Sequence, residues 1–148
     1  MKIYFDVCCI NRPFDDQTHD RIHMESEAII TIFKHIEFDE WILVSSGVIN
    51  YEINQTTDEE RLIRLQALVQ DASVFVKVDQ YTLLRASQIQ KTGIKAYDSL
   101  HIACAEQGKA DVLLSTDDKL IKLAKRNRQK FHVEIENPLI WLQKVVYK

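Results

Sequence analysis

Hydrophobic residues along this chain fall into short continuous runs, and these alternate with longer segments whose apolar positions recur at helical spacing. The runs at 2–6, 41–46 and 111–116 are bounded by polar residues and predict buried strands. Shorter apolar runs at 73–78 and 131–135 predict two more strands.

Between the strands, the apolar spacing predicts helices. Ser45 or Ser46 is a suitable cap for a short helix that carries Glu52, and Gly93 and Gly108 each follow a helix. Helices are expected at 18–36, over Val48 to Ile53, at 58–69, from Asp79 or Gln80 to Thr92, and at 94–107, 117–127 and from 137 onward. This order of strand then helix predicts an α/β fold with three layers, in which helices cover both faces of a mainly parallel sheet of four to five strands.

Length and composition limit the class of protein. A chain of 148 residues is sufficient for one filled core, so a single domain over 1–148 is expected. A net charge of -3 argues against binding nucleic acid through overall basicity. The N-terminus lacks the pattern of a signal peptide, and the three cysteines lack zinc-site spacing, so we expect a cytoplasmic protein with reduced thiols.

Four acids occupy positions where α/β proteins bind ligands. Asp6, Glu52 and Asp117 each follow a predicted strand, and Asp98 lies in the first turn of a helix. Clustered carboxylates repel one another unless a cation joins them, and hard oxygen ligands favour Mg²⁺ or Mn²⁺. The four acids therefore suggest metal-dependent hydrolysis of a phosphodiester. The alternative for any one of these acids taken alone is a helix cap or a solvated side chain.

Four segments resemble those of the PIN-domain family, and in particular of VapC-like toxins from prokaryotic toxin–antitoxin pairs. They are IYFDVCCINRPFDD, SSGVINYEI, GIKAYDSLHIACAE and DVLLSTDDKL, and together they span nearly the whole chain. The third segment is the most specific, because it combines Asp98 with LHIACA and is followed by a short strand and S-T-D.

The resemblance implies an Mg²⁺- or Mn²⁺-dependent endoribonuclease in which water attacks the phosphorus in line and leaves a 5′-phosphate and a 3′-hydroxyl. Asp6, Glu52, Asp98 and Asp117 would form the catalytic set, with the three aspartates holding the metal. It also implies an RNA substrate, a homodimer and a cognate antitoxin protein that lays a peptide across the acidic site.

The segment after Asp6 departs from the family pattern at two positions. Val7 and Cys8 stand where the family commonly has Thr and then Ser or Asn, so a polar contact near the metal is missing. Asn11 is the residue that we expect to replace it. Ser115 remains where a Ser or Thr is usual, two residues before Asp117.

Several other residues are weaker candidates. Asp118 is an alternative to Asp117, and His101 shares a helical face with Asp98, although a packed or hydrogen-bonded histidine is the more common case. Basic residues near Asp117 either form a solvated helix face or contact the RNA backbone; they are Lys119, Lys122 and Arg126.

Other side chains are given structural interpretations. His19 and His23 have a spacing that can hold zinc but lack the H-E-x-x-H pattern. Tyr97, Trp41 and Trp141 lie in apolar segments and are expected in the core. Turn and helix-start roles are expected for Asp15, Asp16 and Asp20.

Two rival functions are compatible with acids at strand ends. A metal-dependent phosphatase is disfavoured because Cys8 interrupts the D-x-D pattern that would begin at Asp6. A non-catalytic binding module of the same fold stays open, although all four acids are present. The RNA target depends on a groove that the sequence does not define.

Overall fold

The computed structural model describes residues 1–147; Lys148, the last residue of the predicted domain 1–148, lies outside the described residues. A five-stranded parallel sheet in the order β3-β2-β1-β4-β5 forms the centre of this described part. The strands are β1 (Lys2–Phe5), β2 (Ile42–Ser46), β3 (Val74–Val76), β4 (Val112–Leu114) and β5 (Glu134–Glu136). The predicted α/β class and parallel sheet are confirmed.

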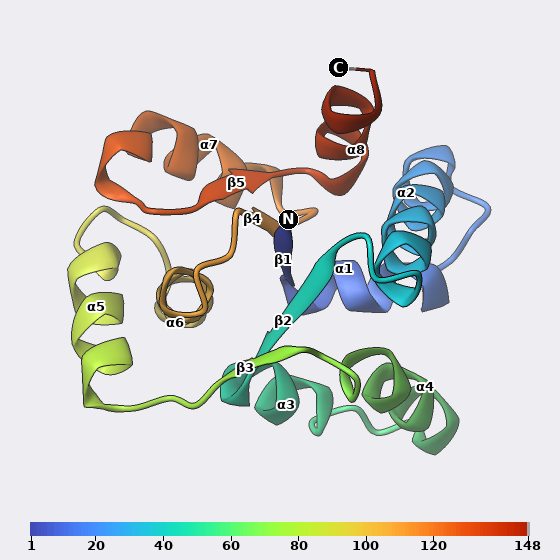
Figure 1. Cartoon of the computed structure of the whole chain (residues 1–148), viewed down its shortest axis with the longest axis horizontal. Coiled ribbons are helices and arrows are strands. Elements are labelled where there is room, and N and C mark those ends of the chain that lie inside the picture. Colours follow the sequence, from blue (N-terminus) through green and yellow to red (C-terminus); the bar gives the residue numbers. More distant parts are fainter. Residues whose placement is uncertain (148) are drawn as a thin grey trace.

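Helices cover both faces of the sheet, as predicted. Figure 1 shows α5, α6 and α7 on one side, α1, α2 and α8 on the other, and α3 below the strand ends. The α-helices are α1 (Val7–Asn11), α2 (Asp20–Glu37), α3 (Gly47–Ile53), α4 (Glu59–Val69), α5 (Gln80–Gln90), α6 (Ala96–Gln107), α7 (Asp118–Arg126) and α8 (Pro138–Val146). Two 3-10 helices, η1 (Arg12–Phe14) and η2 (Arg128–Lys130), complete the secondary structure of the described residues.

The strand order creates a crevice between β1 and β4. The chain leaves β1 toward β2 on one side of the sheet and leaves β4 toward β5 on the other. Ligands of open α/β sheets bind at such a reversal, beyond the carboxyl ends of the strands. The backbone N–H of Asp6 donates to the carbonyl oxygen of Leu114 at 2.9 Å, which brings the ends of these two strands together.

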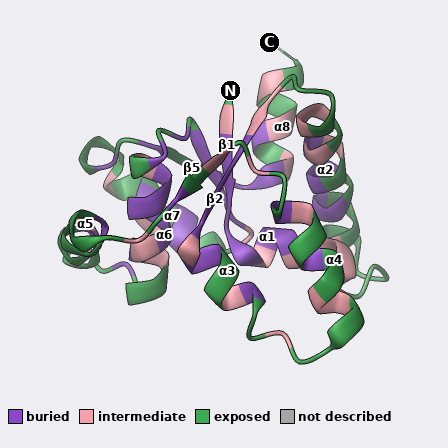
Figure 2. Ribbon diagram, turned by 60° about the horizontal axis from the view of Figure 1, so that its bottom comes forward, coloured by how far each residue is buried: buried purple, intermediate pink, exposed green. Residues whose placement is uncertain are grey.

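Strand β1 lies at the centre of the core. Ile3, Tyr4 and Phe5 are fully buried, as expected for a central parallel strand with both faces covered. Figure 2 shows the buried strands between helices whose outer faces are exposed. Helix α6 lies between the sheet and α5, and nearly all of its second half is buried.

Helix α6 approaches the sheet closely at its C-terminal end. A Cβ atom added to Gly108 would lie 2.7 Å from Val44 Cγ1 and 2.9 Å from Val76 Cγ2. Both distances are too short for real side chains, so a glycine is required here. The same helix carries Asp98 and His101, and its close packing therefore fixes two candidate site residues.

A short helix that the sequence did not predict follows β1, because α1 begins at Val7 directly after Asp6. Cys8 and Cys9 lie on this helix. All three cysteines carry free thiols, and Cys9 and Cys104 are buried.

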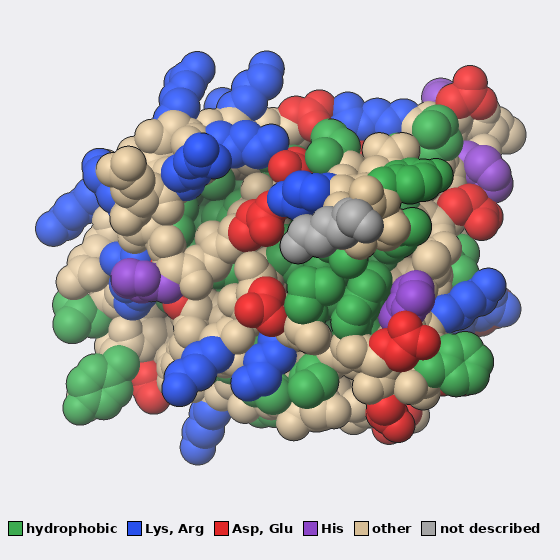
Figure 3. Space-filling view, turned by 45° about the horizontal axis from the view of Figure 1, so that its top comes forward, with side chains coloured by type: hydrophobic (Ala, Val, Ile, Leu, Met, Phe, Trp, Pro, Cys, Tyr) green, Lys and Arg blue, Asp and Glu red, His purple; other side chains and the backbone are tan. Residues whose placement is uncertain are grey.

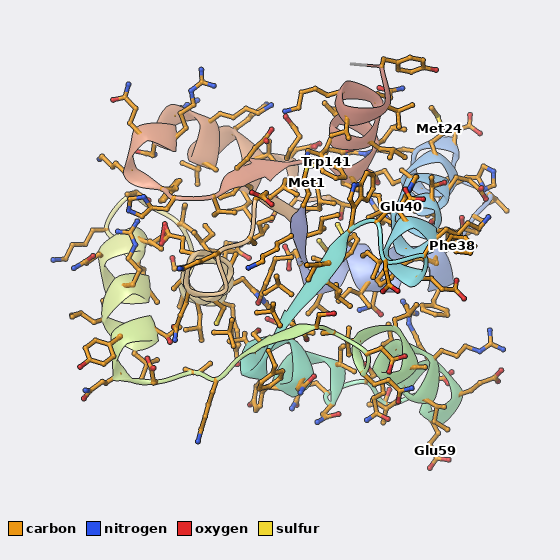
Figure 4. The ribbon with its side chains drawn as sticks, viewed as in Figure 1. Met1, Met24, Phe38, Glu40, Glu59 and Trp141 are labelled. Atoms are coloured by element: carbon orange, nitrogen blue, oxygen red, sulfur yellow. The ribbon has the colours of Figure 1, made fainter. Side chains whose placement is uncertain are left out.

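Two of the three aromatic predictions agree with the structure. Trp141 is buried and packs edge-to-face on partly buried Trp41 with ring centroids 5.2 Å apart. In Figure 4, Trp141 lies within the fold, whereas Phe38 and Glu59 extend from its rim. Tyr97 is different, because it is 52% exposed, so its assignment to the core was wrong.

No helix within residues 1–147 is long and apolar enough to cross a membrane.

Candidate active site

Asp6 and Asp117 are linked through Ser115 at the crevice between β1 and β4. Asp6 follows β1 directly and is almost fully buried. The hydroxyl of buried Ser115 donates to Asp6 Oδ2 at 2.9 Å and accepts the backbone N–H of Asp117 at 3.1 Å. Ser115, a supporting residue in the sequence prediction, therefore holds one acid of the predicted set and fixes the backbone at another.

Glu52 is held by a chain of buried polar side chains. Its Oε1 lies 2.7 Å from Nε2 of His101, and Nδ1 of this histidine lies 2.6 Å from the hydroxyl of Tyr4. The Tyr4 hydroxyl in turn lies 2.8 Å from Oγ of Ser46, which accepts the N–H of Ile49 and so caps α3. The chain thus connects the helix that bears Glu52 to α6 and to β1.

The direction of these hydrogen bonds follows from Glu52. An ionised carboxylate only accepts hydrogen bonds, so Nε2 of His101 must donate to it. Burial raises the pKa of the Tyr4 hydroxyl well above its usual value, so Tyr4 keeps its proton. With His101 neutral, Tyr4 donates to Nδ1; with His101 charged, Nδ1 donates to Tyr4. In both states the Nε2–H is directed at Glu52.

The charge on His101 is favoured by its acidic neighbours. Burial lowers the pKa of His101, but its hydrogen bond to Glu52 and the negative charges of Asp6, Glu52 and Asp98 raise it more, so the net shift is upward. The sequence prediction that His101 is a hydrogen-bonded histidine on the face of Asp98 agrees with this geometry. His101 is only 2% exposed, so it has almost no contact with solvent. Its hydrogen bond to Glu52 is therefore the contact through which it affects the site.

Asp98 lies between two hollows that together include all four predicted acids. On one side, a cavity of ≈ 410 Å³ is lined by Asp6, Glu52 and Asp98, along with Tyr51, Gln55 and Tyr97. On the other side, Asp98 shares a smaller pocket of ≈ 60 Å³ with Asp117. The four acids, which are far apart in the sequence, thus converge on one end of the sheet.

Burial and the acids around Asp98 raise its pKa. Burial and the negative charges of Asp6 and Asp117, with a smaller effect from Glu52, raise it from an ordinary 3.8 to about 6, although His101 opposes the shift. Such a site is electrostatically unfavourable for the protein alone. A bound cation would remove the repulsion and stabilise all four carboxylates.

Asp117 and Asp118 make different contacts in the structure. Asp117 caps α7, because its Oδ1 accepts the N–H groups of Lys119 and Leu120. Asp118 instead forms a two-fold ion pair with Arg21 of α2, each bond 2.8 Å long, and this pairing lowers the pKa of Asp118. Asp117 is therefore the acid that lies beside Asp98, and Asp118 anchors the start of α7.

The side chain of Asn11 is hydrogen-bonded to residues outside the set of four acids. Its amide nitrogen donates to the carbonyl oxygen of Val7 at 3.1 Å, and its Oδ1 accepts from Nε of Arg61 at 3.0 Å. These contacts tie α1 to α4. Near Asp6, the polar contacts come from Ser115 and from the Cys8 thiol, which lies 3.6 Å from Ser115 Oγ and accepts the N–H of Thr116 at 3.5 Å.

The basic residues of α7 form a surface next to the acids. Figure 3 shows Lys and Arg side chains gathered at the upper left, over α7. Lys119 lines the small pocket with Asp98 and Asp117, whereas Lys122 and Arg126 are exposed farther along the helix. His19 and His23 are both exposed at the start of α2.

The donor set suits Mg²⁺ or Mn²⁺. No three His, Cys, Asp or Glu side chains within residues 1–147 are grouped as a ready-made metal cage. Mg²⁺ does not require one, because it usually keeps several waters and takes one or two protein carboxylates together with substrate phosphates. Oxygen donors that repel one another at a shared cavity, without a thiolate or imidazole facing it, fit such an ion.

Sequence reasoning missed Tyr4, Ser46 and Tyr51 as parts of the site. Tyr4 carries a polar hydroxyl in an otherwise apolar buried strand, and a buried hydroxyl needs a partner. That was the available signal. Tyr51 and Tyr97 each directly precede an acid of the set, which is visible in the sequence but has meaning only once α3 and α6 lie side by side.

Comparisons with known proteins agree with the fold. A chain in a structure of VapBC2 from Rickettsia felis bound to a DNA fragment from their promoter shares the fold at a TM-score of 0.59 and 12% identity, over 93% of this chain and 98% of that chain. A chain of VapBC-1 from nontypeable Haemophilus influenzae does so at a TM-score of 0.56 and 15% identity, with the same two coverages of 93% and 98%. No curated protein sequence matches significantly. The PIN domain family model matches residues 3–126, and the chain therefore belongs to the PIN domain family.

Proposed function

We propose that this protein is a divalent-metal-dependent endoribonuclease and the toxin of a toxin–antitoxin pair. PIN domains are generally nucleases, which supports hydrolase activity. The observation that carries the proposal for this chain is the convergence of Asp6, Glu52, Asp98 and Asp117, expressed in the raised pKa of Asp98. The RNA substrate and the choice of Mg²⁺ or Mn²⁺ come from the sequence resemblance.

The four acids divide into two roles in this proposal. Asp6, Asp98 and Asp117 would hold the cation, with Ser115 fixing the orientation of Asp6. When bound, the ion would lower the pKa of a water molecule and neutralise charge on the phosphate. Glu52 accepts the proton of the attacking water, and His101 keeps its carboxylate facing the cavity. Lys119 lies where it can contact a neighbouring phosphate.

The partners follow from the family resemblance and from the structural neighbours. Both neighbours are chains of VapBC structures, which supports a protein antitoxin as the partner of this chain. A homodimer, a cytoplasmic location and a single domain over 1–148 also belong to this proposal. The free thiols of all three cysteines are compatible with a reducing compartment.

The decisive experiment is cleavage of a small panel of structured and unstructured RNAs. We expect cleavage with Mn²⁺, none with EDTA, and loss of cleavage in Asp98→Asn. Asp118→Asn is the matched control, because it removes a neighbouring aspartate that is paired with Arg21. Its cleavage rate should stay close to that of the wild type. Cleavage that persists in EDTA and in Asp98→Asn would exclude the mechanism.

The same experiment tests the non-catalytic module. A module that only binds RNA would retain affinity for the panel and leave every RNA intact with Mn²⁺. The acid-lined cavity favours the enzyme, because a pure RNA-binding surface would gain nothing from acids that repel phosphates.

A further inference from the structure

Two exposed tyrosines form the rim of the acidic cavity. Tyr51 is 56% and Tyr97 52% exposed, and their rings lie nearly parallel, with an interplanar angle of 13° and centroids 6.4 Å apart. Both line the cavity of ≈ 410 Å³ that contains Asp6, Glu52 and Asp98. Two exposed rings side by side at the mouth of an acid-lined cavity form a contiguous apolar surface, and such surfaces mark interaction sites.

The two tyrosines are placed by the same helices that place the acids. Tyr51 precedes Glu52 on α3, and Tyr97 precedes Asp98 on α6. Successive helical residues point about 100° apart, so each helix directs an acid into the cavity and a ring along its rim. Any ligand that reaches the acids from solvent through this cavity also meets the two rings.

We propose that Tyr51 and Tyr97 form a stacking site for an unpaired base next to the scissile phosphate, so that these two rings position the RNA strand at the acids. This inference rests on the proposed nuclease function and adds two positioning residues to it. Flat aromatic faces bind bases by stacking, which is available only to bases that are not already stacked within a duplex. The amide of Gln55, which lines the same cavity, supplies a donor and an acceptor for the edge of that base.

The composition of the cavity favours a nucleotide over a protein segment. A nucleotide matches both parts of the cavity, because its phosphate pairs with cations held by the acids and its base covers the rings. A cationic peptide matches the acids only when no metal is bound. Stacking also requires a flat ring on the protein, so aromatic replacements and aliphatic ones should behave differently.

The test measures binding of a fluorescently labelled single-stranded oligoadenylate in the presence of Mn²⁺. Glu52→Gln serves as the background, because it removes the proposed proton acceptor and keeps the three aspartates. In this background, Tyr51→Ala and Tyr97→Ala should each weaken binding by about 5- to 150-fold, the range measured for one base stacked on an aromatic ring. Tyr51→Phe and Tyr97→Phe should retain binding, and Tyr51→Leu should not.

Tyr81→Ala is the matched control. Tyr81 is 70% exposed on α5 and does not line the cavity, so its loss should leave affinity unchanged. An oligoadenylate paired with its complement should bind more weakly than the single strand and should respond little to the tyrosine variants. In otherwise wild-type protein, the same variants should raise KM for single-stranded substrates more than they lower kcat.

The outcomes separate this inference from the nuclease proposal. If the protein cleaves RNA and the alanine variants bind and cut like the wild type, the stacking site is refuted and the nuclease stands. If single strands bind through the tyrosines but are never cut, the site stands and the nuclease falls. Variants that lose an Arg-rich peptide and keep the oligoadenylate, or that change the oligomeric state, would assign the rings to a protein interface and overturn the inference.

Discussion

Replacement of Asp98 by Asn should stabilise the metal-free protein while it abolishes cleavage. The pKa of Asp98 is raised from 3.8 to about 6 by burial and by the acids around it. Ionising a fully shielded group with this pKa would cost about 3 kcal/mol of folding free energy. Asp98 is only partly buried, so solvent screening reduces the expected gain for Asp98→Asn to roughly 1–2 kcal/mol.

The effect depends on pH in a defined direction. Between about pH 4 and pH 6 the folded protein binds more protons at Asp98 than the unfolded chain, so wild-type stability falls as the pH rises through this window. Asp98→Asn lacks this loss. The variant should therefore be more stable than the wild type above pH 6, and the difference should vanish near pH 4.

Urea denaturation with EDTA from pH 4 to pH 8 measures this difference. Asp118→Asn is a suitable control, because the ion pair with Arg21 lowers the pKa of Asp118 and its loss should not stabilise the protein. Adding Mn²⁺ should raise wild-type stability and leave Asp98→Asn nearly unchanged, since only a site that binds the ion gains from it. A variant that is no more stable than the wild type at pH 8 would refute the electrostatic reasoning.

Two further changes test the packing and the polar chain behind the site. His101→Ala should reduce kcat with little change in KM, whereas His101→Gln, which can still donate to Glu52, should recover part of the activity. Equal loss in both variants would show that the hydrogen bond to Glu52 does not account for the role of His101. Gly108→Ala should lower the free energy of unfolding by about 1–3 kcal/mol, because the added Cβ would collide with Val44 and Val76. Urea denaturation measures this change, and an unchanged midpoint would contradict the close approach of α6 to the sheet.

The fold was largely predictable because its signals are local. Continuous apolar runs identified the strands, and Ser46, one of the two predicted caps, lies at the start of α3. Helix α1 was missed because it has only five residues and its segment contains turn-forming residues nearby. Tyr97 was placed in the core because its neighbours are apolar, although its own side chain lies on the exposed side of α6.

The candidate site was predictable as a set of residues but not as a network. The positions of Asp6, Glu52 and Asp98 follow from strand ends and motif resemblance. The contact between His101 and Glu52 joins residues 49 positions apart, and that between Tyr4 and His101 joins residues 97 apart. Such contacts depend on strand order and helix packing, which residue spacing does not encode. The pairing of Asp118 with Arg21 was hidden for the same reason.

The most direct test of the acidic metal site is calorimetric titration of the protein with Mn²⁺. We predict one saturable binding process in the wild type, loss of this binding in Asp98→Asn and Asp6→Asn, and retained binding in Asp118→Asn. Binding to wild type and Asp98→Asn with the same affinity would contradict the account, because Asp6, Asp98 and Asp117 would then not share a cation.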